Sequence, residues 1–150
     1  MKERNLFFED YKIGDQFECD PITFTEKGII DFASKHDPRD FHLSHEAAEK
    51  TMFGALIASG FQTLADTWRC WVDKGWENKG AICGYGLDKV RWHRPVFAGD
   101  VTRTKLEVVG LEDRPEKKNG IVVFSVESYN QDDRMVISYL AQVLTSYRKD

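Results

Sequence analysis

The sequence predicts an α+β domain in which one long helix packs against an antiparallel sheet that wraps around it. Apolar residues recur at helical spacing in the middle of the chain, and from Cys83 onward the spacing changes to the period of two that is typical of strands. The chain has 150 residues, of which 41% are hydrophobic, which is enough for one core. We therefore expect one domain over residues 1–150.

The first third of the chain predicts a strand and two short helices. A strand is expected within residues 16–24, and a helix follows over residues 25–35, where the opening threonine can cap the first turn. Pro38 disfavours helical geometry in the residue before it, so residues 38–42 are predicted as a loop. Ser44 then caps a second short helix.

The strongest helical pattern begins at residue 59. Its apolar positions recur at i, i+3, i+4 and i+7 and share one face: Phe61, Leu64, Ala65, Trp68, Trp71 and Val72. The run from Ser59 to Gln62 has the Ser-x-x-Gln form of a capping box, in which each side chain binds a backbone amide at the helix start. Gly75 marks the far end of this helix.

The second half of the chain predicts sheet. Alternating apolar and polar residues indicate four strands, over residues 85–93, 101–111, 121–130 and 134–147. The polar stretch 112–119 is predicted as a loop tip between two of them. Short connections of this kind are typical of antiparallel neighbours.

Composition excludes several classes of function. Charged residues make up 31% of the chain with both signs interspersed, and the formal net charge is -4, so neither nucleic acid nor a membrane is an expected partner. The charged opening residues lack the apolar core of a signal peptide, which predicts a cytoplasmic protein. Cys19, Cys70 and Cys83 contain no Cys-x-x-Cys pair and the histidines lack a ligand spacing, so we expect neither a disulfide framework nor a metal.

The run HDPRDFH contains the first candidate for chemistry. Asp37 and His42 lie five residues apart in it, and a carboxylate beside an imidazole can perform paired general acid and base catalysis on water. The competing structural interpretation is that Asp37 is a turn residue before proline and that His42 is a core histidine bonded to backbone. The motif alone favours that structural interpretation.

The start of the main helix contains the second candidate. A backbone N–H in the first helical turn has no partner within the helix, and Gly60 has no side chain to obstruct a ligand that approaches it. Such an amide suits a thioester oxygen that gains negative charge. The structural alternative is that Ser59 and Gly60 only cap a buried helix.

Basic residues gather near the first two long strands and form the third candidate. If these strands pair, alternation places some of the residues on one face, where they could meet the phosphates of a nucleotide. The set comprises Lys89, Arg91, His93, Arg94, Arg103 and Lys105. A solvated sheet face is the more common explanation for such charges.

The run FASKHDPRDFHLSHEAAEKTMFGALIASGFQTLA is similar to the active-site region of the MaoC-like dehydratases, a family that includes the (R)-specific enoyl-CoA hydratases. The stretches FFEDYKIGDQFECDPITFTEKGIIDFA and GLDKVRWHRPVFAGDVTRTKLEVVGL extend the resemblance over most of the chain. The resemblance implies a single hot-dog domain, in which a long central helix is wrapped by an antiparallel sheet. It also implies a homodimer or a higher homo-oligomer.

By position, the resemblance assigns catalysis to Asp37 and His42, which together bind and activate one water molecule. It assigns Gly60 to the amide that polarises the thioester carbonyl, with Ser59 beside it at the helix start. The implied reaction is reversible addition of water to a trans-2-enoyl-CoA, which gives an (R)-3-hydroxyacyl-CoA. An acyl-CoA is then the substrate, and no cofactor is required.

One residue departs from the family pattern. The family often has Asn or Gln two residues after the aspartate, and this chain has Arg39. A cation there would favour a negative charge on Asp37 or bind a carboxylate of the substrate. Two other functions therefore stay open: an acyl-CoA thioesterase, and a non-catalytic acyl-CoA-binding protein in which only the pocket remains.

Overall fold

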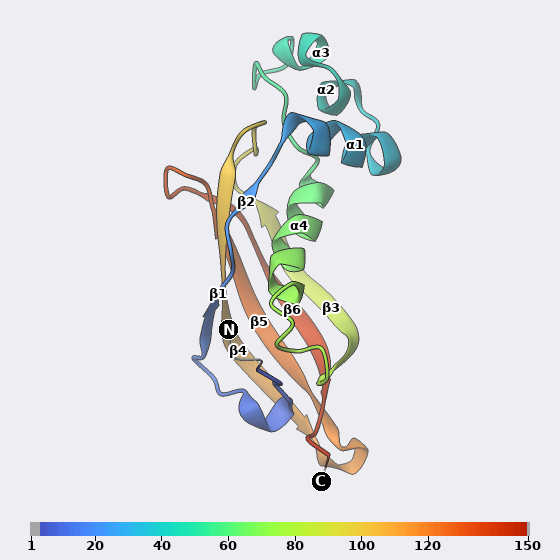
Figure 1. The fold of residues 1–150 in the computed structure, drawn as a ribbon, viewed down its shortest axis with the longest axis vertical. Helices are drawn as coiled ribbons and strands as arrows, with labels where there is room; N and C mark the ends of the chain where they lie inside the picture. The colour runs from blue at the N-terminus through green and yellow to red at the C-terminus, as the bar shows by residue number, and fades with distance from the viewer. Residues whose placement is uncertain (1–3, 150) are drawn as a thin grey trace.

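The computed structural model describes residues 4–149; residues 1–3 and 150, which the predicted domain also includes, lie outside the described residues. Its strands form an antiparallel sheet that runs along the length of the molecule, and the longest helix lies against one face of that sheet (Figure 1). The shorter α-helices gather at the end where this helix begins (Figure 1). A sheet wrapped along one helix is the arrangement that the sequence predicts.

The four predicted long strands are all present. They are β3 (Ala81–Trp92), β4 (Val101–Arg114), β5 (Asn119–Tyr129) and β6 (Met135–Ser146). A single 3-10 turn, η2 (Pro115–Lys117), connects β4 to β5, so the loop predicted over residues 112–119 is shorter than expected. The period of two therefore located the strands correctly and misplaced only their ends.

The order of the strands differs from the expected one. The order is β1-β4-β5-β6-β3, so β3 pairs with β6 and not with β4. The chain cannot turn directly from β3 into a hairpin, because the residues that follow β3 pair with the segment before the main helix, where the Ala58 N–H donates to the Val96 carbonyl. The expectation that the basic residues of β3 and β4 lie on paired strands is wrong, since β5 and β6 separate them.

The N-terminal residues cover the other edge of the sheet. Two short strands, β1 (Gln16–Glu18) and β2 (Ile22–Thr23), both pair with β4, where the sequence predicts one strand. Pro21 lies between them and has no N–H for a continuous ladder. A short 3-10 helix, η1 (Phe8–Asp10), precedes them and packs Phe8 against Gly120 of β5.

The first helix and the third have the predicted caps. In α1 (Glu26–His36) the Thr25 hydroxyl accepts the Gly28 N–H at 3.0 Å, and in α3 (His45–Glu49) the Ser44 hydroxyl accepts the Ala47 N–H at 3.3 Å. Between them lies α2 (Asp40–Leu43), so the loop predicted over residues 38–42 is wrong in its second half. Proline restricts only the residue before it, and the chain is free to form a helical turn after Arg39.

The main helix, α4 (Gly60–Val72), begins where the sequence predicts, but its capping box does not form. The Ser59 hydroxyl accepts the Phe61 N–H at 3.2 Å, while the Gln62 side chain donates to Asp66 at 3.2 Å instead of reaching back to the helix start. Gly75 follows the helix at φ 72°, a conformation that glycine adopts without strain.

The face of α4 that packs on the sheet is not the predicted apolar face. The buried residues of this helix are mostly polar or small: Gln62, Thr63, Thr67, Cys70 and Trp71. Phe61 is 61% exposed, and of the six residues that predicted the helix only Trp71 is fully buried. Its indole packs against the rings of Phe17 and Phe124, at centroid distances of 4.9 and 5.4 Å.

Candidate active site

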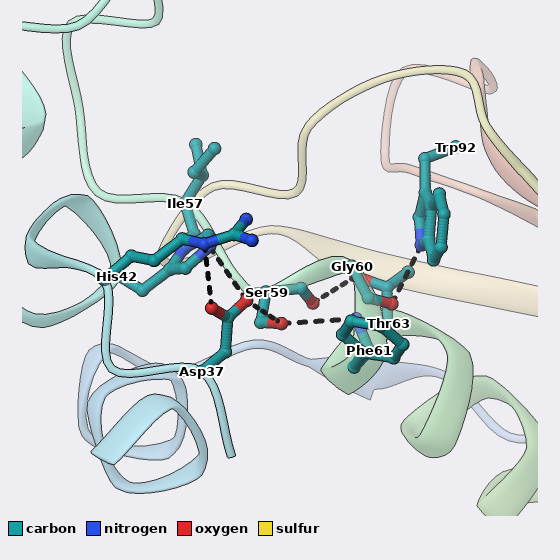
Figure 2. Close-up of polar contacts among 9 residues, drawn as sticks. Asp37, His42, Ile57, Ser59, Gly60, Phe61, Thr63 and Trp92 are labelled. Atoms are coloured by element: carbon teal, nitrogen blue, oxygen red, sulfur yellow. Dashed lines mark hydrogen bonds and ion pairs between the residues drawn. The ribbon is translucent and has the colours of Figure 1, made fainter. Parts of the chain in front are cut away.

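The structure brings four of the predicted site residues into the lining of one pocket. Asp37, Arg39, His42 and Gly60 line a pocket of about 420 Å³ at the end of the molecule where α4 begins, and Ser59 is buried behind it. These residues come from the end of α1, from α2 and from the start of α4 (Figure 2). The fold therefore joins segments that lie more than twenty residues apart.

His42 is buried and held in one orientation. Its Nδ1 lies 2.7 Å from the carbonyl oxygen of Ile57, and the residue is 4% exposed. Because a carbonyl oxygen only accepts hydrogen bonds, Nδ1 must carry the hydrogen, and Nε2 of the neutral ring is then a proton acceptor. Nε2 lies 3.5 Å from Oδ2 of Asp37, so two proton acceptors face each other in the pocket (Figure 2).

The Ile57 carbonyl that orients His42 belongs to a firmly held segment. Leu56, Ile57 and Ala58 are buried, and Ile57 forms an antiparallel bridge with Phe97. The Ala98 N–H donates to the Leu56 carbonyl at 3.2 Å, on the other side of that bridge. The imidazole is therefore oriented by backbone that other backbone holds in place.

Asp37 is fixed by contacts to both carboxylate oxygens. Its backbone caps the end of α1, where its N–H donates to the Ala33 carbonyl, and the residue is 9% exposed. Oδ2 accepts the Ser59 hydroxyl at 2.7 Å, and Oδ1 lies 3.3 Å from Nε of Arg39. Since Ser59 also accepts the Phe61 N–H, one hydroxyl connects the carboxylate to the first turn of α4 (Figure 2).

Gly60 contributes a backbone amide at the helix start. The next three amides of α4 are occupied: the Phe61 N–H bonds the Ser59 hydroxyl, and those of Gln62 and Thr63 bond the Ser59 carbonyl. Within residues 4–149, no such bond takes up the Gly60 N–H. That amide remains available to a ligand in the pocket, at the positive end of the helix dipole.

The indole of Trp92 presses against Gly60. Its Nε1–H donates to the Gly60 carbonyl at 2.8 Å, and a Cβ built on residue 60 would lie 2.7 Å from two atoms of that indole. Glycine is therefore required by the close approach of Trp92, which locks the first turn of α4 from the side opposite Asp37 (Figure 2).

A family model described as MaoC like domain matches residues 9–130, which is more than half of the chain. The chain belongs to the MaoC-like domain family. This membership confirms the resemblance seen in the sequence, and the family's named relatives include hydratases and dehydratases.

The curated relatives of the MaoC-like chain include both an uncharacterized protein and a named dehydratase. It is 30% identical over 138 residues to the uncharacterized protein YdeM of Bacillus subtilis, covering 91% of this chain and 96% of that protein. It is 35% identical over 99 residues to the 3-hydroxyacyl-thioester dehydratase Z of Mycobacterium tuberculosis, covering 64% of this chain and 65% of that one.

Solved structures confirm the hot-dog fold of the MaoC-like chain. The MaoC-like dehydratase from Rhodospirillum rubrum has a TM-score of 0.88 and 32% identity, over 97% of this chain and 100% of that one. Two other structures of the same fold, at 20% identity or less, are described as complexes.

Sequence reasoning missed two groups that shape this MaoC-like site. The Ile57 carbonyl orients His42, and no pattern of side chains signals a backbone acceptor. Trp92, which falls within the strand predicted over residues 85–93, lines the pocket and holds Gly60. Its position just before His-Arg-Pro was a signal of a strand end, which is where a strand can present a side chain to a site.

The predicted basic set is divided by the fold. His93 and Arg94 line the pocket, whereas Arg103 pairs with Asp133 and Lys105 lies 5.2 Å from the centroid of the Tyr129 ring, on other strands. Only part of that set therefore belongs to the site of this MaoC-like chain.

Among residues 4–149 of the MaoC-like chain, no group of three or more His, Cys, Asp or Glu side chains could hold a metal ion. No helix among those residues is long and apolar enough to cross a membrane.

Proposed function

We propose that this protein catalyses the reversible addition of water to a trans-2-enoyl-CoA thioester, which gives an (R)-3-hydroxyacyl-CoA. The observation that carries the proposal is the pairing of two buried proton acceptors, Asp37 Oδ2 and His42 Nε2, in one pocket with the amide of Gly60. Hydration of an α,β-unsaturated thioester needs these two functions: activation of water and polarisation of the carbonyl.

Asp37 and His42 would activate the water together. The two acceptors lie 3.5 Å apart, close enough for one water molecule to donate to both. One of them removes a proton as the water oxygen bonds to the β-carbon, and the pair returns a proton to the α-carbon. Water and proton would be delivered from the same side, which makes the addition syn, since both come from one pair of side chains.

Gly60 would stabilise the charge that develops on the thioester oxygen. Attack at the β-carbon moves electrons toward that oxygen, and a fixed N–H donor is most valuable where such charge appears. Trp92 holds the helix turn that carries this amide, and Ser59 joins the same turn to the carboxylate of Asp37. The donor and the acid/base pair would therefore keep a constant separation through the reaction.

The proposed reaction moves only the atoms of water, so it requires no resident cofactor. The CoA thioester enters as the substrate. The same amide and carboxylate could also direct water to the thioester carbon itself, which is the thioesterase reaction.

A panel of trans-2-enoyl-CoA thioesters of increasing chain length tests the proposal. We expect loss of the enoyl absorbance on addition of the protein, formation of a 3-hydroxyacyl-CoA, and no free thiol. Release of free CoA thiol without hydration would favour the thioesterase. Tight binding of an acyl-CoA with no reaction at all would favour a binding protein.

We also propose that two copies of the chain assemble as a homodimer. The apolar side of α4 that the sheet does not cover forms a groove of about 600 Å³ with β3 and β6; its walls include Leu64, Trp68 and Leu87. Strand β3 is a sheet edge on which Tyr85 and Leu87 are exposed, and such an edge tends to pair with another chain. A second copy, related by a twofold axis, would cover both.

Sedimentation equilibrium tests the assembly. We expect twice the chain mass of 17.3 kDa, and we expect Leu87→Asp to shift the protein toward the monomer. A wild-type protein that sediments as a monomer at micromolar concentration would contradict the homodimer.

A further inference from the structure

Arginine stands beside the reacting centre of this pocket. The charged side chains of the lining are one aspartate, Asp37, and two arginines, Arg39 and Arg94. The net charge of the lining is therefore positive, whereas the chain as a whole carries a formal net charge of -4. A local excess of positive charge attracts an anionic ligand.

The backbone of Arg39 is fixed between the two proposed catalytic residues. Its N–H donates to the Asp37 carbonyl at 2.8 Å, and its own carbonyl accepts the His42 N–H at 2.9 Å. Arg39 is also the residue that precedes α2, and Pro38 limits the backbone before it. The side chain therefore starts from a rigid position next to the reaction, although it is 68% exposed at the mouth of the pocket.

The guanidinium group of Arg39 uses only one edge on the protein. Nε faces Oδ1 of Asp37 at 3.3 Å, and within residues 4–149 no second acidic group lies within 4.0 Å of it. Arginine has five N–H donors in a planar fork and can bridge two carboxylates at once. The terminal nitrogens are thus available for a second anion that lies within a few ångströms of Asp37.

The phosphates of CoA are not suitable as that second anion. They lie at the far end of the pantetheine arm from the thioester, whereas Arg39 touches the carboxylate that would activate water at the β-carbon. An anion that reaches Arg39 must be carried by the acyl group, close to the β-carbon. A carboxylate on carbon 3 or carbon 4 of the acyl chain has the required charge and position.

We infer that Arg39 is a specificity residue that binds a carboxylate on the acyl group, so that the substrate is the CoA monothioester of an unsaturated dicarboxylic acid. This inference rests on the proposed hydration. Arg94 lines the same pocket, and among residues 4–149 no acidic side chain, Asp37 included, lies within 4.0 Å of it to form an ion pair. It serves as a matched arginine in the same pocket.

Two pairs of substrates that differ only in the terminal group test the inference. Crotonyl-CoA is compared with fumaryl-CoA, and trans-2-pentenoyl-CoA with glutaconyl-CoA; within each pair a carboxylate replaces a methyl group. We expect kcat/KM of the wild-type protein to be about 10-fold or more higher for the carboxylated member of at least one pair, because a hydrogen-bonded charge contributes that much.

Variants assign the preference to a residue. In Arg39→Gln, kcat/KM should become equal for the two members of the preferred pair. Arg39→Lys keeps the charge and loses the planar fork, so it should retain part of the preference. Arg94→Gln should change kcat/KM of both members alike. A preference that persists in Arg39→Gln, or that disappears only in Arg94→Gln, would overturn the inference.

Binding without turnover separates this inference from the proposed function. Succinyl-CoA and butyryl-CoA are saturated, cannot be hydrated and differ only in the terminal group, so calorimetry reports recognition alone. We expect tighter binding of succinyl-CoA to the wild-type protein and equal binding to Arg39→Gln. Equal binding to the wild-type protein contradicts the role of Arg39, whereas absence of hydration of every enoyl-CoA with this binding preference intact contradicts only the hydratase.

Discussion

The two ends of helix α4 contain buried groups of opposite kinds. At its start, Ser59 and Asp37 are polar, buried and bonded to each other, and Gly60 lines a pocket. At its end, the buried indole of Trp71 packs against aromatic rings. Burial of polar groups therefore positions chemistry at one end of this helix, while burial of apolar surface stabilises the fold at the other.

Asp37→Asn should give the largest effect, at the start of the helix. Asparagine keeps the shape of the side chain and can still accept the Ser59 hydroxyl, but it cannot take a proton from water. We expect kcat/KM for enoyl-CoA hydration to fall by about 10³-fold or more, with the free energy of unfolding nearly unchanged. Steady-state kinetics and urea unfolding measure the two quantities; activity within 10-fold of wild type would remove Asp37 from the mechanism.

Trp71→Ala should give the opposite result, at the end of the helix. The side chain is fully buried, and truncation leaves a cavity that costs about 3–5 kcal/mol of unfolding free energy. Val72→Ala is the matched control, because Val72 is exposed and should cost less than about 1 kcal/mol. If the two variants unfold at the same urea concentration, this end of α4 does not hold the core.

Gly60→Ala, at the start of the helix, should lower activity less than Asp37→Asn does. The added methyl group would collide with the Trp92 indole, so the first turn and its amide must shift. We expect kcat/KM to fall by about 10²-fold, as for loss of one donor to a developing oxyanion. The same substitution in a Trp92→Ala background should cost less, and equal costs in both backgrounds would show that the collision is not the cause.

Glu77→Gln should give the smallest effect, and one that depends on pH. Burial raises the pKa of the Glu77 carboxyl above its ordinary value of 4.5. At pH values between 4.5, the pKa in the unfolded chain, and the raised pKa in the folded protein, the folded state binds more protons than the unfolded state. The free energy of unfolding of the wild-type protein therefore falls as pH rises through this range. Glutamine carries no charge, so the variant should be more stable than wild type at pH 7.5 and nearly equal to it at pH 4.

Urea unfolding at both pH values checks this last prediction. An equal difference between variant and wild type at pH 4 and at pH 7.5 would mean that the charge of Glu77 is not what destabilises the fold. Activity per folded molecule should stay the same in this variant, in contrast to the variants at the start of the helix.

Helices and strands followed from local patterns because the pattern and the element share a period. The apolar spacing located α4, and the alternation located β3 to β6, since a one-residue shift would turn every side chain to the other face. The pattern did not say which side of α4 the sheet covers. The structure buries Thr67 and exposes Phe61, because the apolar side of the helix is left for the groove beside β3.

The site was predictable only through its resemblance to a known family. The spacing of Asp37 and His42 by itself favoured a structural role, and nothing local joined these residues to Gly60. The Ser59 hydroxyl caps its own helix by accepting the Phe61 N–H, as expected of the serine, but it also donates to Asp37, which lies 22 residues earlier. Contacts between distant segments depend on how the chain packs, which local preferences do not determine.

By itself the sequence determined the elements, the caps of α1 and α3, and the residues available for chemistry, because each of these depends on neighbours within a few positions. Only the tertiary structure decided that β3 lies beside β6, that the Ile57 carbonyl sets the proton of His42, and that the Ser59 hydroxyl donates to Asp37. These contacts join segments through backbone groups and side-chain directions. Their geometry is fixed only when the sheet and the helices are packed together.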